Sequence, residues 1–173
     1  MIFLASCKYK TQEAIFFDYI NDPKNKITQK IQIGDTHITA KWMSEAYRKL
    51  LRQGKDNYDI SKEDESYYYF NVKFEKLTDE KPTKEKLLYL DFDIQQDFKL
   101  LVNADSILPS MCQKIENGLN SSYEYLVAFE KPRSEQQDFS LIYTDKIFGI
   151  GILAFIYSTK DLLRIPTPKA NKS

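Results

Sequence analysis

The sequence predicts a mainly β protein, built as an antiparallel β-sandwich or sheet with one amphipathic helix, and an α+β arrangement is the alternative. Short segments with apolar residues at every second position recur along the chain, and clusters of turn-forming residues separate them. Only residues 43–53 show a clear helical period. The 173 residues suit a single globular domain, which we place at residues 27–168, followed by a disordered tail at 169–173.

The first predicted strands form a β-hairpin. Residues 27–33 alternate in hydrophobicity, Gly34-Asp35 marks a turn, and residues 37–42 resume the alternation. His37, the sole histidine, falls on the second of these strands. A metal site needs several converging donors, so we expect His37 to be an ordinary strand residue.

The helical period at residues 43–53 predicts an amphipathic helix, with Ser44 as its cap and Gly54 at its end. We expect core packing on one face, with contact to anionic lipid as the alternative use of its basic residues. The predicted buried face consists of Met43, Ala46, Tyr47, Leu50 and Leu51. The predicted exposed face consists of Glu45, Arg48, Lys49 and Arg52.

Residues 67–76 predict a strand whose buried face carries Tyr68, Phe70, Val72 and Phe74. Its other face carries Tyr67 and Tyr69. These two rings form a possible binding surface for sugars, peptides or bases, because aromatic side chains mark interfaces when they cluster on an exposed patch. Cross-strand packing explains the same residues without a ligand.

Residues 87–94 and 98–102 are also expected to be strands, which would place Asp91 and Asp93 on one face with Asp97 nearby. Paired carboxylates can bind calcium or act as acid and base. The segment lacks the glycine and the terminal glutamate of a calcium loop, so a solvated acidic face is the expected role. We predict no metal or cofactor site.

The last part of the chain predicts further strands. Residues 107–118 fit a helix or a strand, with strand favoured, while residues 123–129, 139–143 and 150–157 read as strands. Residues 149–154 match a permissive dinucleotide-binding pattern, but β-forming residues follow where that fold needs a helix. We therefore expect the glycines to permit a β-bulge or a close backbone approach. We expect residues 160–165 to pack back onto the domain.

The chain begins with an apolar and small-residue run, Leu4-Ala5-Ser6, that leads to Cys7. These positions resemble the lipobox of Gram-negative lipoproteins, and the C-terminal pattern of residues 143–166 is similar to that of small uncharacterised bacterial lipoproteins. The resemblance implies residues 1–6 as a truncated signal remnant and lipid attachment at Cys7. The turn-forming composition of residues 21–25 predicts a tether over residues 7–26, in which the apolar residues 14–20 dock on the domain or form one helical turn or strand. Lys8 in place of an aspartate implies the outer membrane.

Only six residues precede Cys7, whereas a signal peptide carries an apolar region of roughly 7–15 residues. The start therefore lies further upstream, or the match is accidental and these residues form an N-terminal strand. If Cys7 carries lipid, Cys112 has no cysteine left to pair with. We expect Cys112 to be a buried, inert thiol, and a Cys7–Cys112 disulfide is the alternative.

The charge balance, with 25 basic and 25 acidic residues, argues against a nucleic-acid partner. The first expectation for function is a lipid-anchored envelope module that binds a macromolecule or supports an assembly, with the membrane and an envelope protein as partners. An envelope hydrolase is the second, for which Asp91, Asp93 and Cys112 are the only candidates. A cytosolic protein with an accidental lipobox is the third.

Overall fold

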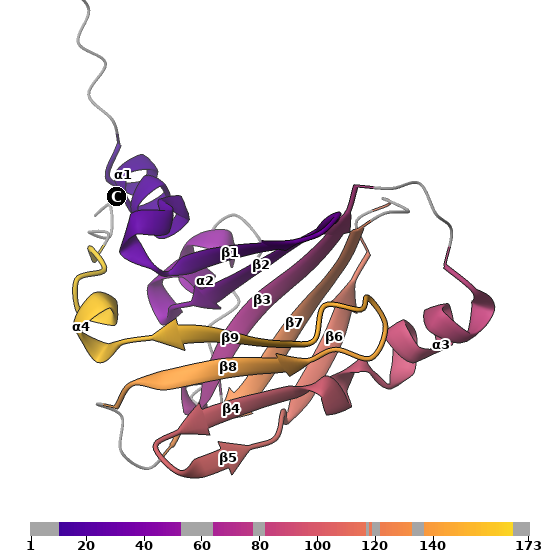
Figure 1. Cartoon of the computed structure of the whole chain (residues 1–173). Helices are drawn as coiled ribbons and strands as arrows, with labels where there is room; N and C mark the ends of the chain where they lie inside the picture. Colours follow the sequence, from indigo (N-terminus) through magenta and orange to yellow (C-terminus); the bar gives the residue numbers. More distant parts are fainter. Residues whose placement is uncertain are drawn as a thin grey trace, which may run out of the picture.

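Two antiparallel β-sheets pack face to face and short helices lie at their ends (Figure 1). This computed structural model describes residues 11–52, 64–77, 82–116, 118, 122–132 and 137–167. The strand order of the five-stranded sheet is β1 (Thr28–Ile33), β2 (Thr36–Met43), β3 (Tyr67–Lys76), β7 (Ser122–Glu130) and β6 (Met111–Ile115). That of the four-stranded sheet is β5 (Asp105–Ile107), β4 (Phe98–Val102), β8 (Phe139–Thr144) and β9 (Ile152–Tyr157). The predicted mainly β fold is confirmed.

The main core lies between the two sheets and is largely aromatic. Alternate residues of β3 point into it, and Phe70 and Phe74 are fully buried. The Phe74 ring centroid lies 4.8 Å from that of Tyr143 on β8, and Phe70 lies 5.4 Å from Tyr157 on β9. The Tyr157 hydroxyl donates to the Ala40 carbonyl at 3.2 Å, which satisfies a buried polar group. These contacts account for the high tyrosine and phenylalanine content.

The hairpin of β1 and β2 is confirmed, with Gly34 at a positive φ of 58° in its turn. The helix α2 (Glu45–Arg52) follows, and Ser44 caps it by accepting a hydrogen bond from the Tyr47 amide at 3.1 Å. The predicted faces of α2 are wrong at two positions: Arg48 is buried and Leu51 is 48% exposed. Gly54 lies outside the described residues.

The helix α1 (Gln12–Asn21) confirms the expectation that residues 14–20 dock on the domain, and it replaces the predicted tether over the described residues 12–26. Its residues Phe16 and Ile20 are fully buried in a second, smaller core with Ile27 and Tyr47. The 3-10 turn η1 (Pro23–Asn25) joins α1 to β1, and the Thr28 hydroxyl donates to the Ile20 carbonyl at 2.8 Å. Residues 12–26 therefore belong to the packed domain. Cys7, residues 1–6 and the tail at 169–173 lie outside the described residues.

The predicted strand over residues 87–94 is wrong, because this segment forms the helix α3 (Lys84–Phe92) and the 3-10 turn η3 (Ile94–Asp97). The Thr83 hydroxyl accepts a hydrogen bond from the Lys86 amide at 3.3 Å and caps the helix. Lysine, glutamate and leucine favour helix. Only Leu90 is buried, so α3 stands at the edge of the domain (Figure 1).

The remaining predicted elements are confirmed. Residues 107–118, where strand was favoured, contain the end of β5 and all of β6, and the β-rich segments that follow form β7, β8 and β9. The short 3-10 turn η2 (Asp64–Ser66) precedes β3, and α4 (Thr159–Leu162) follows β9. Leu162 and Ile165 pack on the second core beside α1. Within the described residues, no helix is long and apolar enough to cross a bilayer.

Candidate functional site

The outer face of the four-stranded sheet is apolar and exposed. We use this name for the side chains of β4, β8 and β9 that point away from the core, with Ser106 of β5 beside them. The strand register aligns Leu101 with Ser140 and Ile156, aligns Lys99 with Ile142 and Ala154, and pairs Thr144 with Ile152. Ile152 is 73% exposed and Ile156 is 60% exposed. Lys99 is the only charged residue among the nine side chains of this face.

The outer face of the five-stranded sheet differs, because charged and amide side chains pair along β3 and between β3 and β7. The Lys73 amino group lies 2.7 Å from a Glu75 carboxylate oxygen, and the Asn71 amide donates to Glu124 at 2.7 Å. His37 also points outward on this sheet, next to the inward-facing Ile38. A water-exposed sheet of a monomer usually looks like this face. The four-stranded sheet therefore carries the unusual surface.

The predicted binding surface at Tyr67 and Tyr69 is not an exposed patch. The Arg48 guanidinium of α2 lies 4.3 Å from the centre of the Tyr69 ring, a cation–π contact, and Tyr69 is buried. Tyr67 is half-buried, and its ring meets the Tyr69 ring at 6.3 Å, edge to face. Tyr69 therefore packs against Arg48 of α2, and Tyr67 packs against Tyr69. This corrects the prediction that the two rings form an exposed ligand surface.

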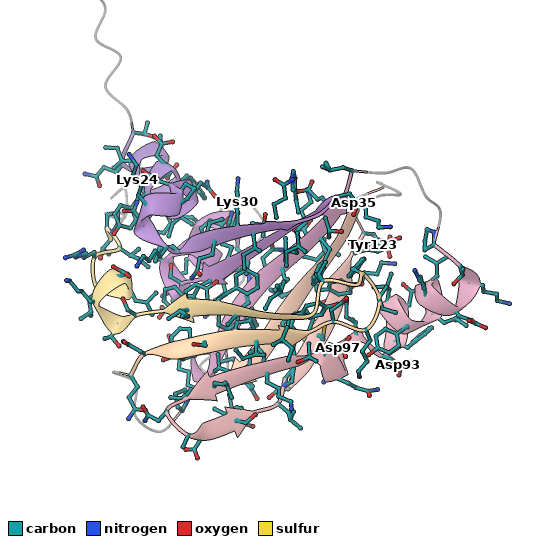
Figure 2. The ribbon with its side chains drawn as sticks, viewed as in Figure 1. Lys24, Lys30, Asp35, Asp93, Asp97 and Tyr123 are labelled. Carbon is teal, nitrogen blue, oxygen red and sulfur yellow. The ribbon has the colours of Figure 1, made fainter. Side chains whose placement is uncertain are left out.

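The acidic candidates do not converge. Asp91 lies on α3, where its Oδ1 accepts from the Lys114 amino group at 2.6 Å. Asp93 ends the helix and accepts from the Gln96 amide at 3.2 Å. Residues two apart on a helix point in different directions. Figure 2 shows Asp93 and Asp97 at the end of the molecule that carries α3. In the part of the chain that the structure describes, no three acidic, histidine or cysteine side chains are grouped to hold a metal ion.

Asp97 is the one acidic residue of this region that is buried, at 1% exposure. Its Oδ1 accepts from the Tyr89 hydroxyl at 2.7 Å and from the Lys146 amino group at 2.9 Å. Its Oδ2 has no hydrogen-bond partner among the described residues. The three side chains tie α3, η3 and the loop after β8 together.

The protonation of this cluster favours a structural role. Burial, followed by the hydrogen bond to Asp97, raises the pKa of Tyr89, so its hydroxyl stays protonated and donates. The hydrogen bond to Asp97, followed by that to Tyr89, raises the pKa of Lys146, so its amino group stays charged. Neither group is activated as a base or a nucleophile near neutral pH.

Cys112 also lacks the features of a catalytic nucleophile. Its half-buried thiol packs against the main core, and burial raises the pKa of Cys112 to about 12. It lies on β6, three strands from the β2 strand that holds His37, or about 14 Å at the usual strand spacing. Cys112 points inward and His37 outward. The prediction of a thiol without a histidine partner agrees with this geometry.

The glycine pattern at residues 149–154 serves a turn. Gly149 and Gly151 have positive φ angles of 74° and 77°, and β9 follows where a dinucleotide-binding fold would need a helix. The Asp145 carboxylate closes this turn by accepting from the amides of Ile147, Phe148 and Ile150 at 2.8–3.0 Å. The fold and its surfaces thus describe a β-sandwich with an apolar outer face on its four-stranded sheet.

No protein-family model and no curated protein sequence matches the chain. Two solved structures share part of its trace. A DUF4426 family protein from Pseudomonas aeruginosa PAO1 has 12% identity and a TM-score of 0.41, over 76% of this chain and 92% of that one. A protein of unknown function from Burkholderia pseudomallei K96243 has 12% identity and a TM-score of 0.46, over 95% and 97% of the two chains. Because the sequence identities and TM-scores are this low, neither structure supports a conclusion about activity.

Proposed function

We propose that this protein is a non-catalytic binding or assembly-support module of the Gram-negative cell envelope. It is held at the outer membrane by lipid on Cys7, and it binds a protein partner through the outer face of the four-stranded sheet. The single observation that supports the binding role is the composition of that face, on which Ile152 and Ile156 are mostly exposed and Lys99 is the only charge.

The apolar side chains of this face are exposed to water. Apolar area gains roughly 25 cal/mol per Å² when a partner removes it from water. Depletion of charge at the centre of a patch is the compositional mark of protein interfaces. The register places Ser140 between Leu101 and Ile156 in one row across three strands, and it pairs Ile142 with Ala154 in the next row, so apolar side chains lie next to one another on this face.

The cell-envelope address is supported by the order Leu4-Ala5-Ser6-Cys7. A single acyl chain binds a membrane only marginally, so stable anchoring needs the several chains of a processed lipoprotein. Because α1 begins at Gln12, a lipid on Cys7 would attach close to the packed domain.

Lipid attachment is tested by intact mass and detergent partitioning of the protein expressed from its own locus with the upstream codons included. We expect a mass increase that requires Cys7 and transfer of the protein into the detergent phase. Cys7→Ala should lose both, whereas the matched variant Cys112→Ala should keep both. An unmodified, water-partitioning wild type would overturn the membrane address and leave the binding face to a protein in another compartment.

A further inference from the structure

We infer that the end of the domain formed by α1, η1 and α4 lies on the membrane surface, with Leu163 and Ile15 in the headgroup region. This inference rests on the proposed lipid at Cys7. It adds an orientation and a second contact, with lipid itself, to the proposed function. Figure 1 shows α1 and α4 at one end of the sandwich and α3 at the other.

The chain between Cys7 and α1 is short. Four Cα–Cα steps, through residues 8–10, join Cys7 to Thr11, whose hydroxyl accepts from the Ala14 amide and caps α1. At a maximum of roughly 3.6 Å per residue, this link spans at most about 14 Å. A bilayer that holds a lipid on Cys7 must therefore lie close to the start of α1.

The helix α1 is fixed to the domain. Phe16 and Ile20 are fully buried, and the Asn25 amide donates to the Tyr19 carbonyl at 2.9 Å. The Thr28 hydroxyl bonds the Ile20 carbonyl at 2.8 Å, so the end of α1 is held to the first strand. Because α1 does not hang from a flexible linker, the short link from Cys7 constrains the whole sandwich and not the helix alone.

Two large apolar side chains are exposed at this end of the domain. Leu163 is 79% exposed and Ile15 is 49% exposed, while Leu162 beside Leu163 packs on the same small core as α1. Helices that lie at a membrane interface bury their apolar face about 5–10 Å into the headgroup and acyl boundary, and Leu163 and Ile15 are the large apolar side chains exposed at the C-cap of α4 and on α1.

Charged residues at this end suit a headgroup region without requiring anionic lipid. Lys24, which Figure 2 shows at this end, and Lys160 are exposed, with flexible stems that let their amino groups reach the headgroups. Lys26 and Arg164 are exposed here too, and the basic residues of this end are balanced by the acidic residues Glu13, Asp18, Asp22 and Asp161. We therefore expect this end of the domain to contact zwitterionic lipid as well as anionic lipid.

The experiment couples the full chain to vesicles and measures the depth of a tryptophan. All variants carry Cys112→Ala, and the Cys7 thiol is joined to a maleimide lipid in phosphatidylcholine vesicles that contain a nitroxide-labelled lipid. Leu163→Trp places a probe at the proposed contact. Phe92→Trp is the matched control on α3, because Phe92 is 77% exposed, close to the 79% of Leu163. Trp42 is retained, and its signal in the parent protein is subtracted.

We expect nitroxide lipid to quench the added fluorescence of Leu163→Trp by about half or more, since an interfacial side chain lies about 5–10 Å deep, and to leave that of Phe92→Trp nearly unchanged. Equal quenching of both probes, stronger quenching of Phe92→Trp, or no quenching of either would overturn the inference. Because the maleimide lipid supplies the anchor chemically, this result is independent of whether cells attach lipid to Cys7. Near-ultraviolet circular dichroism checks that both variants keep the parent fold.

Discussion

Phe16→Ala tests whether α1 belongs to the folded domain. The Phe16 side chain is fully buried, and its ring centroid lies 5.9 Å from that of Phe17 and 6.4 Å from that of Tyr47. Replacing a buried phenylalanine by alanine costs about 3–5 kcal/mol, from lost transfer free energy and the cavity left behind. Because the second core is small and close to the surface, partial collapse should keep the loss near about 3 kcal/mol.

Urea unfolding followed by far-ultraviolet circular dichroism and by Trp42 fluorescence measures this loss. Trp42 packs against both cores, so its emission reports on the junction between them. For a chain of this length, a loss of about 3 kcal/mol lowers Tm by roughly 6–12 °C. The control is Ile15→Ala on the same helix, whose side chain is 49% exposed and which should cost less than about 1 kcal/mol. A loss below about 1 kcal/mol for Phe16→Ala, or a separate early transition for α1, would refute the assignment of this helix to the domain.

The remaining predictions concern three buried or partly buried groups. Burial works to raise the pKa of Asp145, but the backbone N–H groups outweigh it and hold this pKa below its ordinary value. Asp145→Asn should therefore cost about 2 kcal/mol at pH 7 by chemical unfolding, and its deficit relative to wild type should persist above about pH 4 and shrink as the pH falls toward the lowered pKa. A deficit that stays constant down to pH 2 would contradict this. In a Cys7→Ala background, the raised pKa of Cys112 should slow alkylation of its thiol at pH 8 by about 50- to 100-fold relative to a small thiol. Mass spectrometry over time measures this rate, and alkylation as fast as that of the small thiol would contradict the prediction. Asp97→Asn should destabilise the domain by about 1–3 kcal/mol in thermal unfolding, because it removes the buried charge that accepts from the Tyr89 hydroxyl and pairs with Lys146 in the loop after β8. An unchanged Tm would show that the cluster is not structural.

Strand alternation predicted most of the sandwich because each sheet buries one face. β3 is the clearest case, with Phe70 and Phe74 in the core and Asn71 and Lys73 outside. The helix α3 escaped prediction because a short leucine-rich segment fits either a buried strand or a helix by pattern alone. Its composition of lysine, glutamate and leucine was the usable signal, together with Thr83 at the cap position.

The candidate binding face was missed because β9 does not alternate. Its sequence from Ile152 to Tyr157 is apolar throughout, which reads as a buried strand, yet the structure leaves Ile152 and Ile156 exposed. A continuous apolar run in an antiparallel sheet was itself the signal that both faces are apolar. The covering of Tyr69 by Arg48 had no sequence signal, since a cation–π contact depends on how α2 crosses the sheet.

The most direct test of the proposed binding role is site-specific photocrosslinking in cells that produce the full chain. A photoreactive amino acid at Ile156 samples the outer face of the four-stranded sheet, and one at the exposed Gln32 samples the outer face of the other sheet as the control. Our account predicts one discrete cross-linked protein from Ile156, none from Gln32, and loss of the Ile156 product in Cys7→Ala. Equal cross-linking from both positions, or none from Ile156, would contradict it.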